Sequence, residues 1–148
     1  MRRPIIKSWL WLGLVIIVLV SFILAMGSAF MREWYYVFVW WGFLLFLDGL
    51  NFSLKGDSLL SRSWSRFIAY AFFSMSWWCL FEVFNLRLGN WSYHGLPEET
   101  AARWLGYALA YATVIPAIVE LDELFSFFLA GRRCSVFRIE VPPVLLPG

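Results

Sequence analysis

The sequence has few charged residues and almost no histidine or cysteine, and these shortages exclude several classes of protein. Of its 148 residues only 15% are charged, one is histidine and two are cysteine. The formal net charge of +2 is too small for a nucleic-acid-binding surface, and no basic patch with interleaved aromatic residues is present. Neither cysteine has a partner at the spacing of a metal site or a redox motif, so we interpret both as free thiols.

The sequence also lacks the motifs of common catalytic and cofactor sites. It contains no Ser/His/Asp set, no phosphate-binding loop and no haem attachment motif. The single histidine, His94, is followed by Glu98 and Glu99, but a metal site needs three or four ligands in a defined geometry. A surface loop is the better interpretation of this stretch, and we predict neither a metal nor a cofactor.

Hydrophobic residues are abundant instead, at 61% of the chain, and aromatic residues make up 21%. A water-soluble chain of this length could not bury so much apolar surface. A lipid bilayer removes the difficulty, because a helix of about 20 apolar residues crosses its hydrocarbon core. Four such runs are present, at residues 8–30, 34–52, 66–86 and 104–130. The sequence therefore predicts one all-α domain over residues 1–148, a bundle of four transmembrane helices with the lipid bilayer as its partner.

Basic residues predict the orientation of this bundle. If the N-terminus is cytoplasmic, nine Lys and Arg residues fall in cytoplasmic segments and three, Arg32, Arg87 and Arg103, fall outside. The positive-inside rule therefore favours four spans with both termini in the cytoplasm. The first apolar run exceeds the roughly 7–15 residues of a signal peptide, so we expect an uncleaved helix.

The four predicted helices differ in character. Residues 8–30 carry no charge at their centre, which is typical of a peripheral anchor that faces lipid. Residues 53–65 are expected to form a polar turn. Residues 104–130 carry small residues that allow close helix packing, so we place this helix inside the bundle. Pro116 should kink it, and Thr113 could bond the carbonyl that the proline leaves free.

Acidic residues within the predicted spans are the strongest functional signal, because charge is costly in hydrocarbon. Asp48 lies near the inner end of the second helix, Glu82 in the outer half of the third, and Glu120 and Glu123 in the inner half of the fourth. No Lys or Arg lies within a predicted span to pair with them. A carboxyl group kept neutral in such surroundings can donate a hydrogen bond or a proton. Asp122 points to a different face and is expected to be solvated.

The spacing of these acids suggests inward-facing polar stripes. Asp48 and Asn51 are three residues apart, as are Glu82 and Asn85, so each pair shares a helix face. The candidate catalytic residues are Glu82, Asn85 and Glu120. The candidate ligand-binding residues are Asp48, Asn51, Trp78, Trp91, Tyr93 and Glu123.

The same residues also have a structural interpretation. Polar groups hold membrane helices together through interhelical hydrogen bonds, and tryptophans anchor helices at the interface. For Asp48 and Asn51 we favour this structural interpretation. For Glu82 the two interpretations are balanced, and Glu120 and Glu123 could simply lie among headgroups if the fourth span ends near residue 121.

The stretch from Phe81 to Pro97 resembles an uncharacterised family of bacterial, tryptophan-rich polytopic membrane proteins. The family pattern is Glu-x-x-Asn, Asn-Trp-x-Tyr and a following Pro, then Gly-Tyr and Thr-Val-x-Pro-Ala, and residues 40–124 match it. Family members are longer and repeat related elements in a second half. The resemblance implies an amino-terminal half with a missing second half as partner, and it brings no established activity. A weaker similarity, at Pro97-Glu98-Glu99, is to carotenoid-cyclising membrane domains.

Three hypotheses for function follow. The first is a membrane site for a lipophilic, isoprenoid- or carotenoid-like ligand, in which Glu82 is an acid or hydrogen-bond donor, Asn85 positions Glu82, and Glu120 assists from the inner side. The second is a non-catalytic structural or assembly subunit of a membrane complex. The third is a small ion or proton carrier, which is disfavoured because the acids lie at different depths. Whether the protein is an enzyme stays open.

Overall fold

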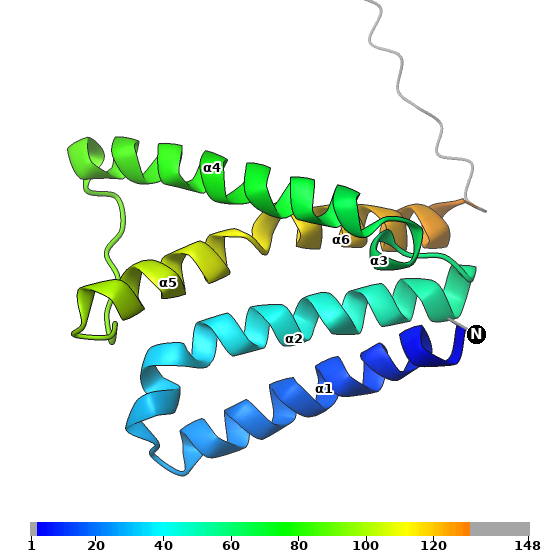
Figure 1. The fold of residues 1–148 in the computed structure, drawn as a ribbon, viewed down its shortest axis with the longest axis horizontal. Coiled ribbons are helices and arrows are strands. Elements are labelled where there is room, and N and C mark those ends of the chain that lie inside the picture. The colour runs from blue at the N-terminus through cyan, green and yellow to red at the C-terminus, as the bar shows by residue number, and fades with distance from the viewer. Residues whose placement is uncertain (1–2, 131–148) are drawn as a thin grey trace, which may run out of the picture.

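The computed structural model describes residues 3–130, and every regular element in that range is a helix. Long helices run back and forth, so that the N-terminus, the short helix α3 and the end of α6 lie together at one end (Figure 1). The α1–α2 and α4–α5 connections lie at the opposite end. We call the first the α3 end and the second the loop end. The helices are α1 (Arg3–Ala25), α2 (Ala29–Lys55), α3 (Leu59–Arg62), α4 (Trp64–Leu88), α5 (Thr100–Tyr111) and α6 (Val114–Leu129). The basic and proline-rich tail after residue 130 lies outside the described residues.

Helix α1 packs mainly against α2 at the edge of the molecule, which agrees with the expected peripheral helix (Figure 1). Glycines make this contact close. A Cβ atom at Gly49 would overlap the backbone nitrogen of Leu10, and one at Gly13 would overlap the backbone of Phe46. The two backbones can approach this closely only because these glycines have no side chain.

The first two helices meet earlier than predicted. The prediction ended the first helix at residue 30 and began the second at residue 34, whereas α1 ends at Ala25 and α2 begins at Ala29. Gly27 adopts a φ of 85°, which stops α1, and Ser28 caps α2 by accepting a hydrogen bond from the Met31 backbone nitrogen at 3.3 Å. These local stop and start signals lie inside an apolar run, so hydropathy alone placed the boundary wrongly.

The turn predicted at residues 53–65 contains a four-residue helix, α3. Gly56, with a φ of 76°, ends α2, and the Ser58 and Ser61 side chains then form a capping box at the start of α3. Ser63 starts α4, which extends two residues beyond the predicted 66–86 at each end.

The continuous helix predicted at residues 104–130 is wrong, because the chain breaks between α5 and α6 at residues 112–113. The hydroxyl of Ser74 on α4 donates a hydrogen bond to the Tyr111 carbonyl and accepts one from the Ile115 nitrogen at 3.0 Å. Thr113 donates to the Ala110 carbonyl at 2.6 Å. The missing N–H of Pro116 favours a break in this region, and Ser74 supplies partners for the backbone groups that the break frees.

Two helices, α2 and α4, are long and apolar enough to span a membrane, and the apolar stretch Trp9–Ala25 of α1 is slightly shorter. In the most apolar window of α4 only 11% of the residues are buried within the protein. Its large aromatic side chains therefore face outward, among them Phe72, Phe73, Trp77, Phe81 and Phe84. So much exposed apolar surface indicates association with a membrane.

Candidate functional site

Polar residues gather in two places, one at each end of the bundle. The first, the carboxyl cluster, lies at the α3 end and consists of Asp48 and Asn51 on α2 and Glu120 on α6. Asp48 and Glu120 are each 1% exposed, and Asn51 is 0% exposed. The three-residue spacing on α2 turns Asp48 and Asn51 to one face, and α6 packs against α2.

The carboxyl cluster holds α3 in place. Oε1 of Glu120 accepts a hydrogen bond from the Leu59 nitrogen at 3.1 Å, and Oδ1 of Asp48 accepts one from the Leu60 nitrogen at 2.8 Å. These N–H groups belong to the first turn of α3, where a helix supplies no acceptor of its own. The cluster therefore fastens the α2–α4 connection to α6.

Asn51 completes the link between α2 and α6. Its Nδ2 donates to the Glu120 carbonyl oxygen at 2.8 Å and also to the Glu120 carboxyl group. The carboxyl groups of Asp48 and Glu120 lie side by side, because they bind the consecutive N–H groups of Leu60 and Leu59. Oδ2 of Asp48 and Oδ1 of Asn51 are buried and have no donor among the described groups.

Next to this cluster lies an ion-paired network around Glu123. Its carboxylate contacts Nζ of Lys55 at 2.6 Å and the guanidinium of Arg62, which also contacts Asp57 at 3.0 Å. Although burial lowers the pKa of Arg62, its hydrogen bond to Glu123 and the charges of Glu123 and Asp57 raise that pKa overall, so the guanidinium stays charged. Glu123 therefore forms ion pairs at the surface, whereas Glu120, one turn earlier, is buried.

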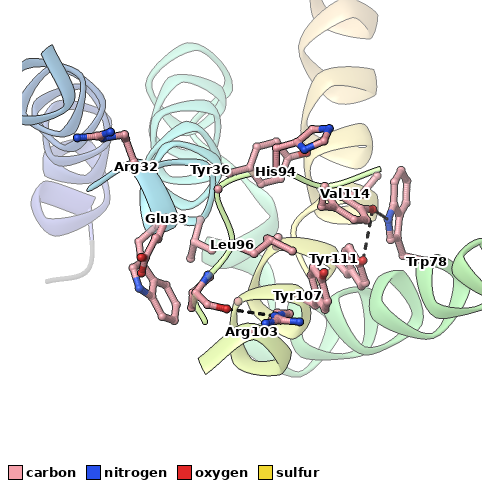
Figure 2. Close-up of a pocket in the computed structure, with 17 residues that line it drawn as sticks. Arg32, Glu33, Tyr36, Trp78, His94, Leu96, Arg103, Tyr107, Tyr111 and Val114 are labelled. Atoms are coloured by element: carbon pink, nitrogen blue, oxygen red, sulfur yellow. Dashed lines mark hydrogen bonds between the residues drawn. The ribbon is translucent and has the colours of Figure 1, made fainter. Parts of the chain in front are cut away.

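The second place is a cavity of about 260 Å³ at the loop end, enclosed by α2, α4, α5 and the loop that precedes α5. Figure 2 shows the rings of Tyr107 and Tyr111 along one side, Trp78 beside them and His94 on the loop above. The rings of Tyr107 and Tyr111 stack with centroids 5.6 Å apart. The aromatic wall of the cavity is formed by Trp34, Tyr36, Trp78, Tyr93, Tyr107 and Tyr111.

A hydrogen-bonded chain connects this cavity to Glu82. The Tyr111 hydroxyl donates to the Tyr93 hydroxyl at 3.3 Å, and the Tyr93 hydroxyl donates to Oε1 of Glu82 at 2.5 Å. The same carboxylate oxygen accepts a hydrogen bond from Nε1 of Trp91 at 3.1 Å. Tyr93 lines the cavity and contacts Glu82, so it couples the carboxyl group to the cavity.

Asn85 was predicted to position Glu82, but its side chain bonds to the loop that precedes α5. Its Nδ2 donates to the Trp91 carbonyl at 2.9 Å, and its Oδ1 accepts from the Trp91 nitrogen at 3.1 Å. The amide matches a backbone N–H and C=O together, which a carboxylate could not do. Asn85 thereby fixes Trp91, whose indole reaches Glu82.

The residues predicted as one catalytic group are split between the two ends. Glu82 lies near the end of α4 at the loop end, is half-buried, and bonds to loop residues; Glu120 lies at the α3 end with Asp48 and Asn51. The ligand-binding candidates divide in the same way. Trp78 and Tyr93 line the cavity, Trp91 reaches Glu82, and Glu123 is ion-paired. Asp122 is exposed, as expected.

Sequence reasoning missed the aromatic residues contributed by α2 and α5. Tyr107 and Tyr111 are four apart and so share a helix face, a signal that could have identified them. Arg103 entered the prediction only through the orientation of the bundle, and Trp34 was not among the candidate residues. In the described part of the chain, no three His, Cys, Asp or Glu side chains could hold a metal ion, and His94 lies 3.1 Å from the Ser92 hydroxyl.

Comparison with protein-family models, with curated proteins and with solved structures found no match to this chain.

Proposed function

We propose that this protein is a four-span membrane protein that binds a lipophilic ligand in the aromatic cavity at the loop end. The observation that carries the proposal is the cavity itself, which is walled by aromatic rings and linked through Tyr93 to the carboxyl group of Glu82. Small-molecule sites are typically apolar hollows with a few convergent polar groups, and this cavity has that composition.

The membrane placement rests on the outward-facing apolar surface. In the proposal α1, α2 and α4 each cross the bilayer once, and α5 with α6 together make the fourth crossing. The apolar surface of α4 is then covered by lipid. Five basic residues of the helices and their connections, Arg3, Lys7, Lys55, Arg62 and Arg66, lie toward the α3 end, against three, Arg32, Arg87 and Arg103, toward the loop end. This bias supports a cytoplasmic α3 end in a bacterial inner membrane.

The size of the cavity limits which ligands can enter it. A volume of about 260 Å³ is slightly below the roughly 300–1,000 Å³ of typical small-molecule sites. It accommodates a ring or a few isoprenoid units, so the end of an isoprenoid or carotenoid-like molecule enters while the rest extends into lipid. The guanidinium of Arg103 lines the cavity and hydrogen-bonds the Pro97 and Glu98 carbonyls, so its charge favours a ligand with a polar group.

Glu82 is proposed to act on the polar end of the ligand through Tyr93. A protonated Glu82 would let the Tyr93 and Tyr111 hydroxyls reverse their donor and acceptor roles, so that a hydroxyl points into the cavity. The ligand would then receive a hydrogen bond, or a proton in an acid-catalysed reaction. Glu120 has no part in this site, because it lies at the other end of the bundle.

A cavity-filling substitution tests the proposal. A Cβ atom at Gly106 would have as its nearest neighbour Cζ3 of Trp34 at 3.9 Å, so Gly106→Leu fills the cavity without overlapping the backbone. Ala101→Leu adds the same side chain on the exposed face of the same helix and is the matched control. All-trans-retinol, with one ring, an isoprenoid chain and a hydroxyl, is a suitable probe because it quenches tryptophan emission.

We expect saturable quenching of the full-length protein and of Ala101→Leu. In Gly106→Leu the affinity should fall about tenfold or more, which corresponds to about 1.4 kcal/mol of binding free energy. Equal affinity in the two variants would remove the cavity from consideration as the binding site. Mass spectrometry of lipids that co-purify with the protein then identifies the natural ligand.

Glu82→Gln separates a chemical role from a structural one. The Gln carbonyl can still accept from Tyr93 and Trp91, so the fold should persist. If Glu82 acts on the ligand, turnover or ligand affinity is lost while stability is retained. If Glu82 only joins helix to loop, the variant behaves as the parent protein does.

The exposed aromatic face of α4 favours a second candidate function, that of an assembly subunit. The same surface that lipid covers in the first proposal can pack against another membrane protein, including the second half that the family resemblance implies. Cross-linking from α4 in native membranes distinguishes the two, because an assembly subunit gives a discrete protein adduct.

A further inference from the structure

The carboxyl cluster contains buried oxygen atoms that ligand binding at the loop end does not use. Oδ2 of Asp48 and Oδ1 of Asn51 are buried and have no donor among the described groups. An unpaired buried acceptor is rare in a native protein and indicates a partner that satisfies it. The orientation of Asn51 is fixed, because its Nδ2 donates twice to Glu120, so exchanging its amide oxygen and nitrogen would place two acceptors together.

Asp48 and Glu120 are placed to hold the missing hydrogen between them. Their carboxyl groups accept hydrogen bonds from consecutive backbone N–H groups of α3, Leu59 to Glu120 and Leu60 to Asp48, so they lie side by side, and two ionised carboxylates have no hydrogen that could join them. Backbone N–H groups and Asn51 occupy Oδ1 of Asp48 and both oxygens of Glu120, which leaves Oδ2 of Asp48 without a partner. One proton on either carboxyl group gives Oδ2 of Asp48 its hydrogen-bond partner, and the bond does not involve Oδ1 of Asn51. We propose that Asp48 and Glu120 form a buried proton-binding site that holds one exchangeable proton between them.

The neighbouring charges do not replace that proton. Two described cations beside the cluster, Lys55 and Arg62, are paired with two anions, Glu123 and Asp57, so this network is balanced. Among the side chains that the structure describes, these ion pairs leave no buried cation at this end for a second buried carboxylate. The pair thus keeps one negative charge, which the Leu59 and Leu60 N–H groups and Asn51 stabilise, and binds a proton taken from water in place of a counter-ion.

The other helices around the pair bring no further charge to it. The described side chains of α1, from Trp9 onward, include no ionisable group, and Asp122 on α6 is exposed. On α4 the half-buried Tyr70 packs against the neighbouring apolar core and Arg66 is exposed. The remaining charged side chains of α4 and α5 lie at the loop end, in Glu82, Arg87 and Arg103.

The proton would stabilise the packing of α2, α3 and α6 at the α3 end. Asp48 and Glu120 together hold the first turn of α3 and join α2 to α6. Removal of the proton leaves two like charges facing each other in a buried site, which favours separation of these elements. Because the folded chain holds a proton that the unfolded chain releases near neutral pH, stability should decrease as pH rises.

Infrared difference spectroscopy of the full chain in lipid nanodiscs tests the site, because a protonated carboxyl group absorbs apart from a carboxylate. The parent protein should show a protonated carboxyl band at pH 7, and ¹³C labelling of the aspartate or of the glutamate carboxyl carbons should shift it, according to which residue carries the proton. In a Glu82→Gln chain, which removes the carboxyl group invoked at the loop end, Asp48→Asn and Glu120→Gln should each abolish the band, because the new amide supplies the hydrogen and the remaining acid ionises. Asp122→Asn, an exposed acid on α6, is the matched control and should retain it.

Three outcomes would overturn the proposal: the band is absent from the parent protein at pH 7, it persists in both cluster variants, or it is lost in Asp122→Asn. A sodium-dependent rise in the unfolding temperature of a parent protein without the band would assign the site to a metal cation instead. If neither cluster variant folds, the isotope shift in the Glu82→Gln chain decides the question by itself. Retinol binding should be unaffected by Asp48→Asn, so this test and that of the aromatic cavity fail independently.

Discussion

Ser74 on α4 donates a hydrogen bond to the backbone carbonyl of Tyr111, where α5 ends, and its hydroxyl also accepts one from the Ile115 nitrogen at 3.0 Å. A side chain from one helix thereby satisfies backbone groups on both sides of a break in another. Ser74 is buried, so water cannot take over these bonds.

Ser74→Ala should therefore destabilise the protein by about 1–3 kcal/mol, the cost of leaving buried backbone groups without partners. Ser76→Ala is the matched control, because the Ser76 hydroxyl is exposed and bonds only to the Phe72 carbonyl of its own helix. Equilibrium unfolding in mixed detergent micelles measures both. Equal stability of the two variants would mean that Ser74 does not support the break.

Two helical glycines, Gly49 in the α1–α2 contact and Gly106 on α5, are expected to respond oppositely to alanine, because the space around them differs. Alanine stabilises a helix by up to about 1 kcal/mol relative to glycine. A Cβ atom at Gly106 has its nearest neighbour at 3.9 Å, so Gly106→Ala should be neutral or stabilising. Gly49→Ala must displace the Leu10 backbone and should cost about 1–3 kcal/mol despite that gain. Unfolding of both variants in one detergent series gives the comparison. A stabilised Gly49→Ala would show that α1 does not pack as closely as described.

The fold could be predicted from sequence only where apolar runs define it. The long helices α1, α2 and α4 were expected because hydropathy acts over whole segments, whereas α3 depends on four residues and a capping box. The position of the α5–α6 break was not predictable from Pro116 alone, because Ser74, far away in sequence, helps to set it.

The candidate sites show the same limit. Three-residue spacing correctly placed Asp48 with Asn51 on one face, but nothing in the spacing reveals that Glu120 is their partner. Glu82 was grouped with Glu120 because both are acids in predicted spans. The sequence already placed Glu82 in the outer half of its span and Glu120 in the inner half, and the assembled bundle places them at opposite ends, Glu82 with the loop and Glu120 with α3. The aromatic cavity was missed because its wall combines α2, α4, α5 and a loop.

The two hydrogen bonds between Asn85 and the Trp91 backbone predict control of the loop over the cavity. Asn85→Ala should release Trp91 and Tyr93 from Glu82 and increase backbone hydrogen exchange across residues 90–97. Asn85→Asp keeps the acceptor for the Trp91 nitrogen and loses the donor to its carbonyl, so its effect should be smaller. Hydrogen-exchange mass spectrometry resolves the loop peptide. Unchanged exchange in Asn85→Ala would contradict the positioning role of Asn85.

The exposed thiol of Cys79 tests whether lipid covers α4. Cys79 lies on α4 and is exposed on the protein surface, so in water it would react freely. In the proposed membrane placement it faces hydrocarbon, where a charged maleimide does not reach it. In a chain with Cys134→Ser, leaving Cys79 as the single thiol, intact membranes should give little labelling and denaturation in detergent should give full labelling. Ser92→Cys in a Cys79→Ser, Cys134→Ser chain is the positive control, because residue 92 lies in the exposed loop at the membrane surface and should label without denaturation. Rapid labelling of Cys79 in intact membranes would place that face of α4 in water and would remove the basis for a span at this helix.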